Sequence, residues 1–294
     1  MAYITLNKSN FFYNLDIIAN KTKSKDKIAL VLKDNAYGHG MLEVASMAQA
    51  YGIKRVVVQS SKEANKIEKY FEYILVLADF PETHNEKIRY TINDITAIQR
   101  FPSGTKVELK VDTGMHRNGI GMDELETALE KIEKQNLRLE AIFTHHGSAD
   151  EETDMFDKQN ENFKQVKSKV SALGRKDLRF HSCNSAALFR SQDFNEDMAR
   201  VGIAAYGCLE LPRSFGELQL KAVLSVYADA ISTRELQKGE AVGYGATFIA
   251  EKACIVSNYD FGYGDGFLRS CSGNYTSPNG LELAGRISMD NSSF

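Results

Sequence analysis

One lysine directly follows an uninterrupted apolar run near the start of this 294-residue chain. Lys33 comes after Ile28–Leu32, five apolar residues bounded by charge that predict a buried strand. A lysine at the end of such a strand is only half solvated, and partial burial lowers the pKa of its amine because the charged form loses water. A neutral amine can attack a carbonyl carbon and form a Schiff base. The simpler alternative is a strand-end lysine whose flexible stem carries its charge into water.

Polar clusters follow four other apolar runs, at 110–119, 144–150, 181–187 and 200–207. The charges of Lys110, Asp112 and Arg117 could form a plain surface ion cluster. Ser185, or the Asn184 before it, could simply cap a helix, although a helix start is also a ready anion site because its free amides point at the ligand. Each cluster therefore has a functional and a purely structural interpretation.

His145 and His146, with His181 farther along, could suggest a metal site. Side chains alternate across a strand, so two adjacent histidines at a strand end point to opposite faces. Only one of the pair can then face a shared site. We therefore expect no metal, and His146 to be a half-buried structural histidine.

Strands and helices must alternate to bring these clusters together. Apolar runs predict strands at 28–33, 54–59, 72–77, 87–92, 106–112, 139–144, 178–182 and about 200–206. Helical periodicity is found at 7–20, 41–50, 61–70, 94–100, 123–134, 156–173 and 184–190. Eight such units predict an α/β fold, a (β/α)8 TIM barrel over residues 6–219, in which chemistry lies at the carboxyl ends of the strands.

The pattern changes near residue 220. A strand-like segment at 218–232 is followed by short runs punctuated by glycines, with no helical period. Residues 220–294 therefore predict a second, mostly β domain.

Composition sets the outer limits. Apolar residues make up 43% of the chain and charged residues 26%, as in an ordinary globular protein, and the net charge is −3. Nothing indicates nucleic acid or an anionic membrane as a partner, and no apolar stretch has the length of a membrane span. No signal peptide is recognisable, and the 4 cysteines show no metal spacing. We expect a cytoplasmic protein.

The eight residues Lys33–Gly40, Lys-Asp-Asn-Ala-Tyr-Gly-His-Gly, resemble the pyridoxal phosphate (PLP) attachment motif of alanine racemases. Six more strings resemble the same family in the same order, up to Asp290. The resemblance implies a PLP-binding barrel in which Lys33 holds the cofactor covalently and Tyr37 contacts its phosphate.

The resemblance also assigns roles to the other clusters. Arg117 would hydrogen-bond the phenolic oxygen of the cofactor and help to bind substrate, with a carbamylated Lys110 holding it in place. His145 would orient the catalytic tyrosine, and Arg200 would face the pyridine nitrogen. The remaining phosphate ligands would be Ser185, Gly202 and Ile203.

The second domain carries further family strings. By resemblance, Tyr244 is the second catalytic base, although a glycine-flanked tyrosine is also a common turn residue. Tyr263 would line the site, and Met289 and Asp290 would lie near the substrate carboxylate. In this family such groups serve the active site of the other subunit, which implies a head-to-tail homodimer.

The expected function is racemisation of alanine by two bases, Lys33 on the D side and Tyr244 on the L side, supplying D-alanine for peptidoglycan. Alternatives are an amino-acid racemase of broader specificity, a related decarboxylase, and a non-catalytic PLP-binding barrel. The family's second domain continues past the string that ends at Asp290, whereas this chain stops at Phe294. An incomplete second domain is therefore expected.

Overall fold

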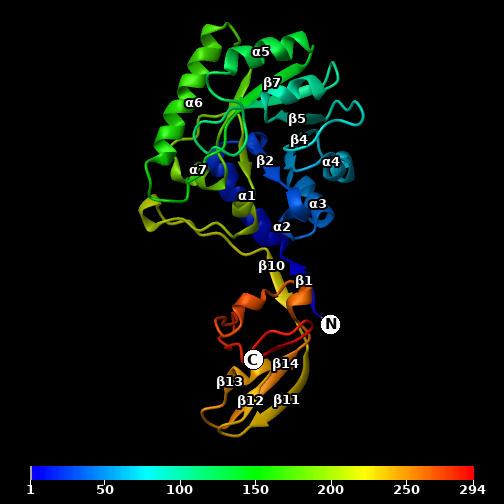
Figure 1. The fold of residues 1–294 in the computed structure, drawn as a ribbon, viewed down its shortest axis with the longest axis vertical. Coiled ribbons are helices and arrows are strands. Elements are labelled where there is room, and N and C mark those ends of the chain that lie inside the picture. Colours follow the sequence, from blue (N-terminus) through cyan, green and yellow to red (C-terminus); the bar gives the residue numbers. More distant parts are fainter. Residues whose placement is uncertain (1) are drawn as a thin grey trace. The chain divides into compact units, whose positions relative to one another are not determined.

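The computed structural model describes residues 2–294, which form two compact units. One unit is Asn7–Val223, and the other joins the residues up to Leu6 with Leu224–Phe294. Figure 1 follows the chain through both units.

The larger unit is built around eight parallel strands. These are β2 (Ile28–Val31), β3 (Arg55–Val58), β4 (Tyr73–Val76), β5 (Ile88–Ile92), β6 (Lys106–Lys110), β7 (Arg138–Phe143), β8 (Arg179–His181) and β9 (Ala199–Val201). They pair in the order β8-β7-β6-β5-β4-β3-β2-β9. Two backbone hydrogen bonds, from Arg200 N to Cys183 O (2.9 Å) and from Asp197 N to Phe180 O (3.2 Å), link the two edges. The predicted (β/α)8 barrel is confirmed as a nearly closed barrel.

Helices surround these strands because each presents an apolar stripe to them (Figure 1). They are α1 (Lys8–Thr22), α3 (Met41–Tyr51), α4 (Ser61–Ile67), α5 (Leu125–Lys134), α6 (Met155–Ala172) and α7 (Ser185–Arg190). Helix α5 shows the pattern, with Leu125, Ala128, Leu129 and Ile132 buried. The side chain of Asn7 caps α1 by accepting from the amide of Asn10.

Three predicted elements differ in detail. The segment predicted as a helix at 94–100 is a 3₁₀ helix, Ile95–Arg100. The strand predicted at about 200–206 is short, because the chain turns at Gly202 into the single helical turn α8 (Ile203–Tyr206). The strand-like segment at 218–232 splits into β10 (Leu224–Tyr227) and β11 (Ala230–Leu236), and residues 218–223 form no strand.

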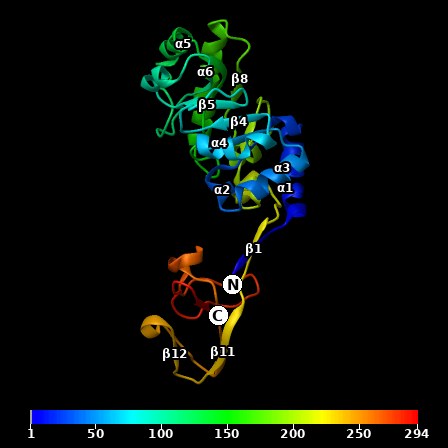
Figure 2. The ribbon, with the colours of Figure 1, turned by 90° about the vertical axis from the view of Figure 1, so that its right-hand side faces the viewer.

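The smaller unit is mostly β, as predicted. Strand β11 pairs antiparallel with β14 (Cys254–Tyr259), which also pairs with β15 (Ser292–Ser293). Strands β12 (Ala241–Val242) and β13 (Phe248–Ile249) form a small ladder. The sequence analysis did not anticipate that β1 (Tyr3–Leu6) pairs antiparallel with β10, so that the start of the chain belongs to this unit (Figure 2).

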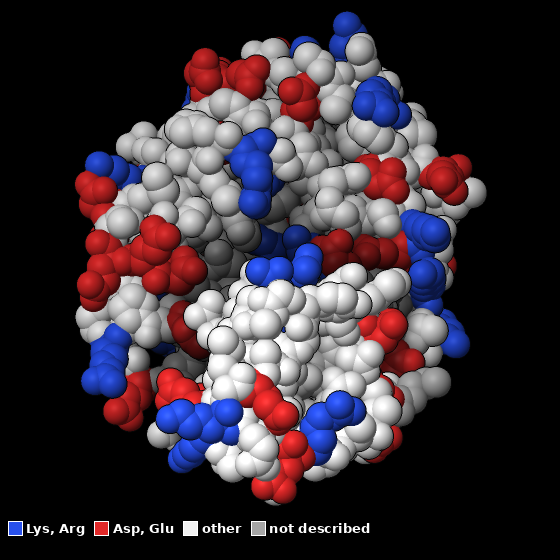
Figure 3. Space-filling view, turned by 60° about the horizontal axis from the view of Figure 1, so that its bottom comes forward, with Lys and Arg blue, Asp and Glu red and all other residues white. Residues whose placement is uncertain are grey.

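The surface carries mixed charge. Basic and acidic side chains are interspersed on the face drawn in Figure 3, so this face presents no extended field of one sign. Within residues 2–294, the helices are too short or too polar for any of them to cross a membrane.

Candidate active site

A cavity of about 510 Å³ lies in the barrel unit, lined by residues at and beyond the carboxyl ends of the strands. Its lining includes nine residues that the sequence singled out: Lys33, Tyr37, Lys110, Arg117, His145, Ser185, Arg200, Gly202 and Ile203. They come from five strand ends that are far apart in the sequence. The volume is in the range of small-molecule sites.

Lys33 is followed by a turn of left-handed backbone. It begins α2 (Lys33–Tyr37), in which the next four residues, Asp34 to Tyr37, all have positive φ, between 53° and 56°. Each left-handed L-residue costs about 1–2 kcal/mol, so this turn exists only because its surroundings enforce it. The lysine side chain itself is loosely held, with one ion pair of 3.9 Å to Asp34.

Glu63 is one of the groups that enforce this turn. Its Oε1 accepts from the amide of Asp34 (2.8 Å) and its Oε2 from the amide of Gln59 (2.7 Å). The carboxylate thus ties the lysine-bearing turn to the chain after β3. Sequence analysis did not identify Glu63, because its role depends on a contact with backbone 29 residues away.

Tyr37, Ser185 and Gly202 meet at one side of the cavity. A Cβ at position 202 would lie 2.6 Å from the Tyr37 hydroxyl, so any larger residue there would displace the tyrosine ring. Asn184 provides the cap of α7, which leaves the Ser185 Oγ to accept from the amides of Gly202 (3.1 Å) and Ala204 (3.4 Å). The helix cap that the simpler interpretation proposed is therefore Asn184 and not Ser185.

Arg200 is buried, and both terminal nitrogens of its guanidinium are hydrogen-bonded. Its Nη2 donates to Thr144 O (2.7 Å) and Ser182 O (3.0 Å), and its Nη1 contacts His181 Nδ1. A guanidinium has donors only, so this geometry fixes a permanent positive charge against the cavity.

Lys110 is buried rather than part of a surface ion cluster. Burial, together with the charges of Arg200 and Arg117, lowers the pKa of its amine to about 8. Asp112 instead shapes the loop that leads to Arg117, since its Oδ1 accepts from the amides of Gly114 (2.9 Å) and Met115 (3.0 Å).

His145 and His146 point to different sides, as predicted. His145 lines the cavity, and burial together with the nearby Arg200 lowers its pKa to about 2, which keeps the ring neutral. His146 is buried, packs on Phe156 and contacts Ser182 Oγ through Nε2 (3.1 Å). In the described part of the chain no group of three or more metal-ligating side chains is found.

The remaining predicted residues belong to the smaller unit and are exposed there: Tyr244, Tyr263, Met289 and Asp290. Backbone hydrogen bonds join the second and third of these segments: Tyr263 N donates to Ser288 O (3.0 Å), and Gly264 N to Met289 O (2.8 Å). A Cβ at Gly245, beside Tyr244, would lie 3.5 Å from the Arg286 guanidinium. Three segments separated in sequence thus lie together in this unit.

The residues of the cavity fit the PLP that the resemblance implies. An amine, a fixed guanidinium and a hydroxyl–amide cradle closed by a glycine match the aldehyde, the ring nitrogen and the phosphate of that cofactor in chemical kind. Glu108 and His181, which lie behind Arg200, were not assigned functional roles from the sequence. The alternation Lys106-Val107-Glu108-Leu109-Lys110 was the available signal, since it places charge on the inner face of a barrel strand.

Comparison with known proteins gives a consistent result. The family model for the alanine racemase N-terminal domain matches residues 6–210, and the model for the C-terminal domain matches residues 223–294. Alanine racemases of Campylobacter concisus and a Nitratiruptor species are 45% and 44% identical over 99% of this chain, which spans 87% and 86% of their lengths. Both domains of the family are thus represented in this chain.

Solved structures agree with the sequence comparison. Alanine racemase from Bacillus anthracis, with bound L-Ala-P, has a TM-score of 0.87 and 28% identity over 99% of this chain and 81% of its own. A histidine racemase from Leuconostoc mesenteroides has a TM-score of 0.81 and 25% identity over 99% of this chain and 83% of its own. By both of its domain models and by its similarity to these relatives, the chain belongs to the alanine racemase family of isomerases.

Proposed function

We propose that this protein interconverts L-alanine and D-alanine with PLP bound in the barrel cavity. The observation that carries the proposal is the convergence of nine residues, from five strand ends, on one cavity in a chain of this family. PLP, when bound, supplies an aldehyde carbon for an amine and a conjugated ring that withdraws electrons from the substrate Cα.

The chain's own groups divide the remaining work. Lys33 holds the cofactor and moves the Cα proton on the D side, and Tyr244 moves it on the L side. Lys33 suits this role because its side chain is loosely held and reaches the cavity. His145, neutral because it is buried beside a cation, can accept or donate a hydrogen bond to orient the tyrosine.

Arg200 limits how far charge spreads into the cofactor ring. A group that only donates and stays charged cannot readily give a proton to the ring nitrogen. The ring is then a weaker electron sink, which suits proton exchange at Cα better than side reactions such as transamination. Tyr37, Ser185, Gly202 and Ile203 hold the phosphate.

Lys110 and Arg117 act together. The depressed pKa of Lys110 gives a substantial fraction of neutral amine near pH 8, the form that carbon dioxide can carbamylate. A carbamate would place a negative charge among Arg117, Arg200 and the other cations of the cavity, and would hold Arg117 toward cofactor and substrate. Met289 and Tyr263 complete the substrate site.

Tyr244, Tyr263 and Met289 act in the active site of a second subunit, so the working form is a homodimer. Their exposure within the smaller unit makes them available to a partner. The proposed location is the cytoplasm, and the proposed product use is D-alanine for peptidoglycan.

A broader amino-acid racemase is the second candidate, favoured by the similarity to a protein described as a histidine racemase. A non-catalytic PLP-binding barrel is disfavoured because it needs no second domain with the Tyr244 string. A decarboxylase is disfavoured by the match to the racemase C-terminal domain.

The test is a chiral assay of the purified protein with PLP and each enantiomer of alanine, followed by Tyr244→Phe. We expect the variant to lose proton abstraction from L-alanine by ~10²–10⁴-fold, the usual contribution of a general base, and far less from D-alanine. Primary deuterium isotope effects in the two directions report the asymmetry. Tyr227→Phe is the control, since Tyr227 is also an exposed tyrosine of the smaller unit. Equal, small losses in both directions would show that Tyr244 only packs.

A further inference from the structure

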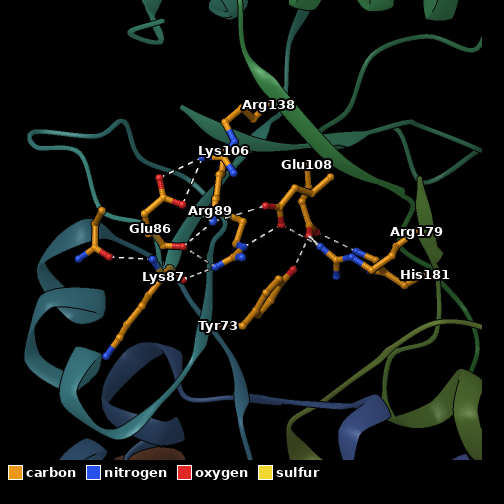
Figure 4. Close-up of polar contacts among 11 residues, drawn as sticks. Tyr73, Glu86, Lys87, Arg89, Lys106, Glu108, Arg138, Arg179 and His181 are labelled. Atoms are coloured by element: carbon orange, nitrogen blue, oxygen red, sulfur yellow. Dashed lines mark hydrogen bonds and ion pairs between the residues drawn. The ribbon is translucent and has the colours of Figure 1, made fainter. Parts of the chain in front are cut away.

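A network of buried polar side chains in the barrel connects Glu108 to Arg200 through His181. Figure 4 shows Tyr73, Arg179 and His181 converging on Glu108, whose side chain is fully buried on β6. We propose that Glu108 is a positioning residue for Arg200: its carboxylate fixes the tautomer of His181, and His181 in turn fixes the guanidinium. The importance of Arg200 for catalysis rests on the proposed function, whereas the tautomer of His181 does not.

The proton positions follow from the donors. Arg200 can only donate, so His181 Nδ1, which faces its Nη1, has to be the accepting nitrogen and carries no proton. A neutral imidazole then has its single proton on Nε2. That nitrogen lies 2.8 Å from Glu108 Oε2, which accepts it. The two neighbours of His181 thus demand the same tautomer.

The charge on Glu108 is needed for this arrangement. Its Oε1 accepts from Arg179 Nη2 (3.0 Å) and from the Tyr73 hydroxyl, so both oxygens face donors. Burial raises the pKa of this carboxyl, but the hydrogen bonds that it accepts from His181 and Tyr73 and the positive charge of Arg179 outweigh burial and hold the pKa below its usual range. Burial lowers the pKa of His181, which favours the neutral ring. The group facing His181 is therefore a carboxylate that accepts only.

An amide in place of the carboxylate would break this consistency. If the Gln oxygen faced His181, its NH₂ would face Arg179, which also only donates. If the NH₂ faced His181, the ring would have to accept on Nε2 and carry its proton on Nδ1, against Arg200. In the first case the Gln NH₂ and the Arg179 guanidinium, both donors, face each other. In the second case the His181 Nδ1–H and the Arg200 guanidinium face each other.

Glu108 also belongs to a structural ion network, so the test needs a control that perturbs the network without touching His181. Tyr73→Phe is that control, because it removes one donor to Glu108 Oε1 and leaves the Glu108–His181 bond in place. Both Tyr73→Phe and Glu108→Gln leave a buried polar group without its partner, so both should lower thermal stability.

The first measurement needs no variant at position 108. Nitrogen NMR of the unmodified 294-residue chain with labelled histidine, without and with PLP, reports the protonation of each of the 6 histidines. His181→Asn assigns the signal. We expect a neutral His181 with its proton on Nε2 from pH 6 to pH 9. A proton on Nδ1, or a charged ring in this range, would overturn the proposal, and this arm stands even where a variant does not fold.

The second measurement compares the variants. We expect Glu108→Gln to shift the His181 signal toward the other tautomer or a mixture, and to lower kcat by about 10–100-fold with a much smaller change in KM, as for outer partners of active-site groups. Tyr73→Phe should keep both the tautomer and kcat within about twofold. An unchanged tautomer together with an unchanged kcat in Glu108→Gln, or an equal loss of kcat in Tyr73→Phe, would overturn the positioning role. If wild type shows the expected tautomer but no racemisation, the proposed function fails and the tautomer assignment stands.

Discussion

Lys33 and Arg200 are two cations at the carboxyl ends of neighbouring parallel strands, β2 and β9, and they are held in opposite ways. The lysine side chain is 32% exposed and makes one long ion pair. The arginine is 5% exposed and donates to three carbonyl oxygens and to a histidine ring. Their backbones show the reverse, since Lys33 leads into a left-handed turn and Arg200 lies in a regular strand.

This contrast follows from what each group has to do. A nucleophile that exchanges partners needs a side chain free to move, so its position is set by the backbone that carries it. A permanent charge can be fixed by its hydrogen-bond partners, because it never has to release them. Lys33 is therefore positioned by a strained backbone conformation. Arg200 is positioned by buried hydrogen bonds to its guanidinium.

Lys33→Ala should have the largest effect, on chemistry alone. We expect loss of the visible absorbance of protein-bound PLP and of borohydride trapping, and a loss of racemisation of at least ~10⁴-fold. The free energy of unfolding without cofactor should change by less than about 1 kcal/mol, because an exposed ion pair contributes little. Chemical denaturation beside the absorbance spectrum measures both, and a covalent cofactor retained on another lysine would contradict the assignment.

Arg200→Met should lower the stability of the protein strongly, in contrast to Lys33→Ala. It leaves Thr144 O, Ser182 O and His181 Nδ1 without their donor, and we expect a loss of about 3–5 kcal/mol in the free energy of unfolding of the cofactor-free protein. Arg117→Met is the matched control: an exposed arginine lining the same cavity, it should change stability by less than about 0.5 kcal/mol. Equal losses in the two variants would remove the contrast between fixed and free groups.

Lys110 adds a pH-dependent test. The pKa of its amine is lowered from 10.5 to about 8, so the folded state disfavours the ammonium. The cost is fully present below about pH 8 and fades as the pH rises toward 10.5, and it reaches about 3 kcal/mol. Lys110→Met removes this titration, so the variant should be more stable than wild type at pH 7 by up to about 3 kcal/mol, and the difference should shrink by pH 10.

This comparison requires carbonate-free buffer, with bicarbonate as the second condition. If Lys110 is carbamylated, bicarbonate should narrow the difference between wild type and variant near pH 8. A difference that does not depend on pH would show that the ammonium is not strained by its burial.

Asp34→Gly should have the smallest effect. Glycine adopts positive φ without a Cβ penalty, so we expect stability to rise by about 0.5–1 kcal/mol, less than the full left-handed cost because the unfolded chain also gains freedom. Lys23→Gly is a control of the same backbone class, since Lys23 has φ 61° at the end of α1, outside the cavity. Both variants should gain stability, but only Asp34→Gly should lower racemisation. No gain in either would mean that this conformation carries little strain here.

Much of this protein could be predicted from local sequence. Apolar runs located all eight barrel strands, since burial on both faces of a parallel sheet leaves a continuous apolar signature. The same logic located Lys33, Lys110, His145, Ser185 and Arg200, because polar residues just after such runs lie at one end of the barrel. The opposed directions of His145 and His146 followed from strand geometry alone.

Tertiary structure decided what depends on distant partners. The hydrogen bond from His181 to Glu108 joins residues that are 73 positions apart, and the type of one residue does not predict the other as its partner. The left-handed turn after Lys33 contains no glycine at its four positive-φ positions, so local preference opposed it and contacts such as that of Glu63 imposed it. The first strand, β1, found its partner more than 200 residues away. Periodicity and composition record which side chains are buried, whereas the choice of contact between distant segments is made only when the whole chain packs.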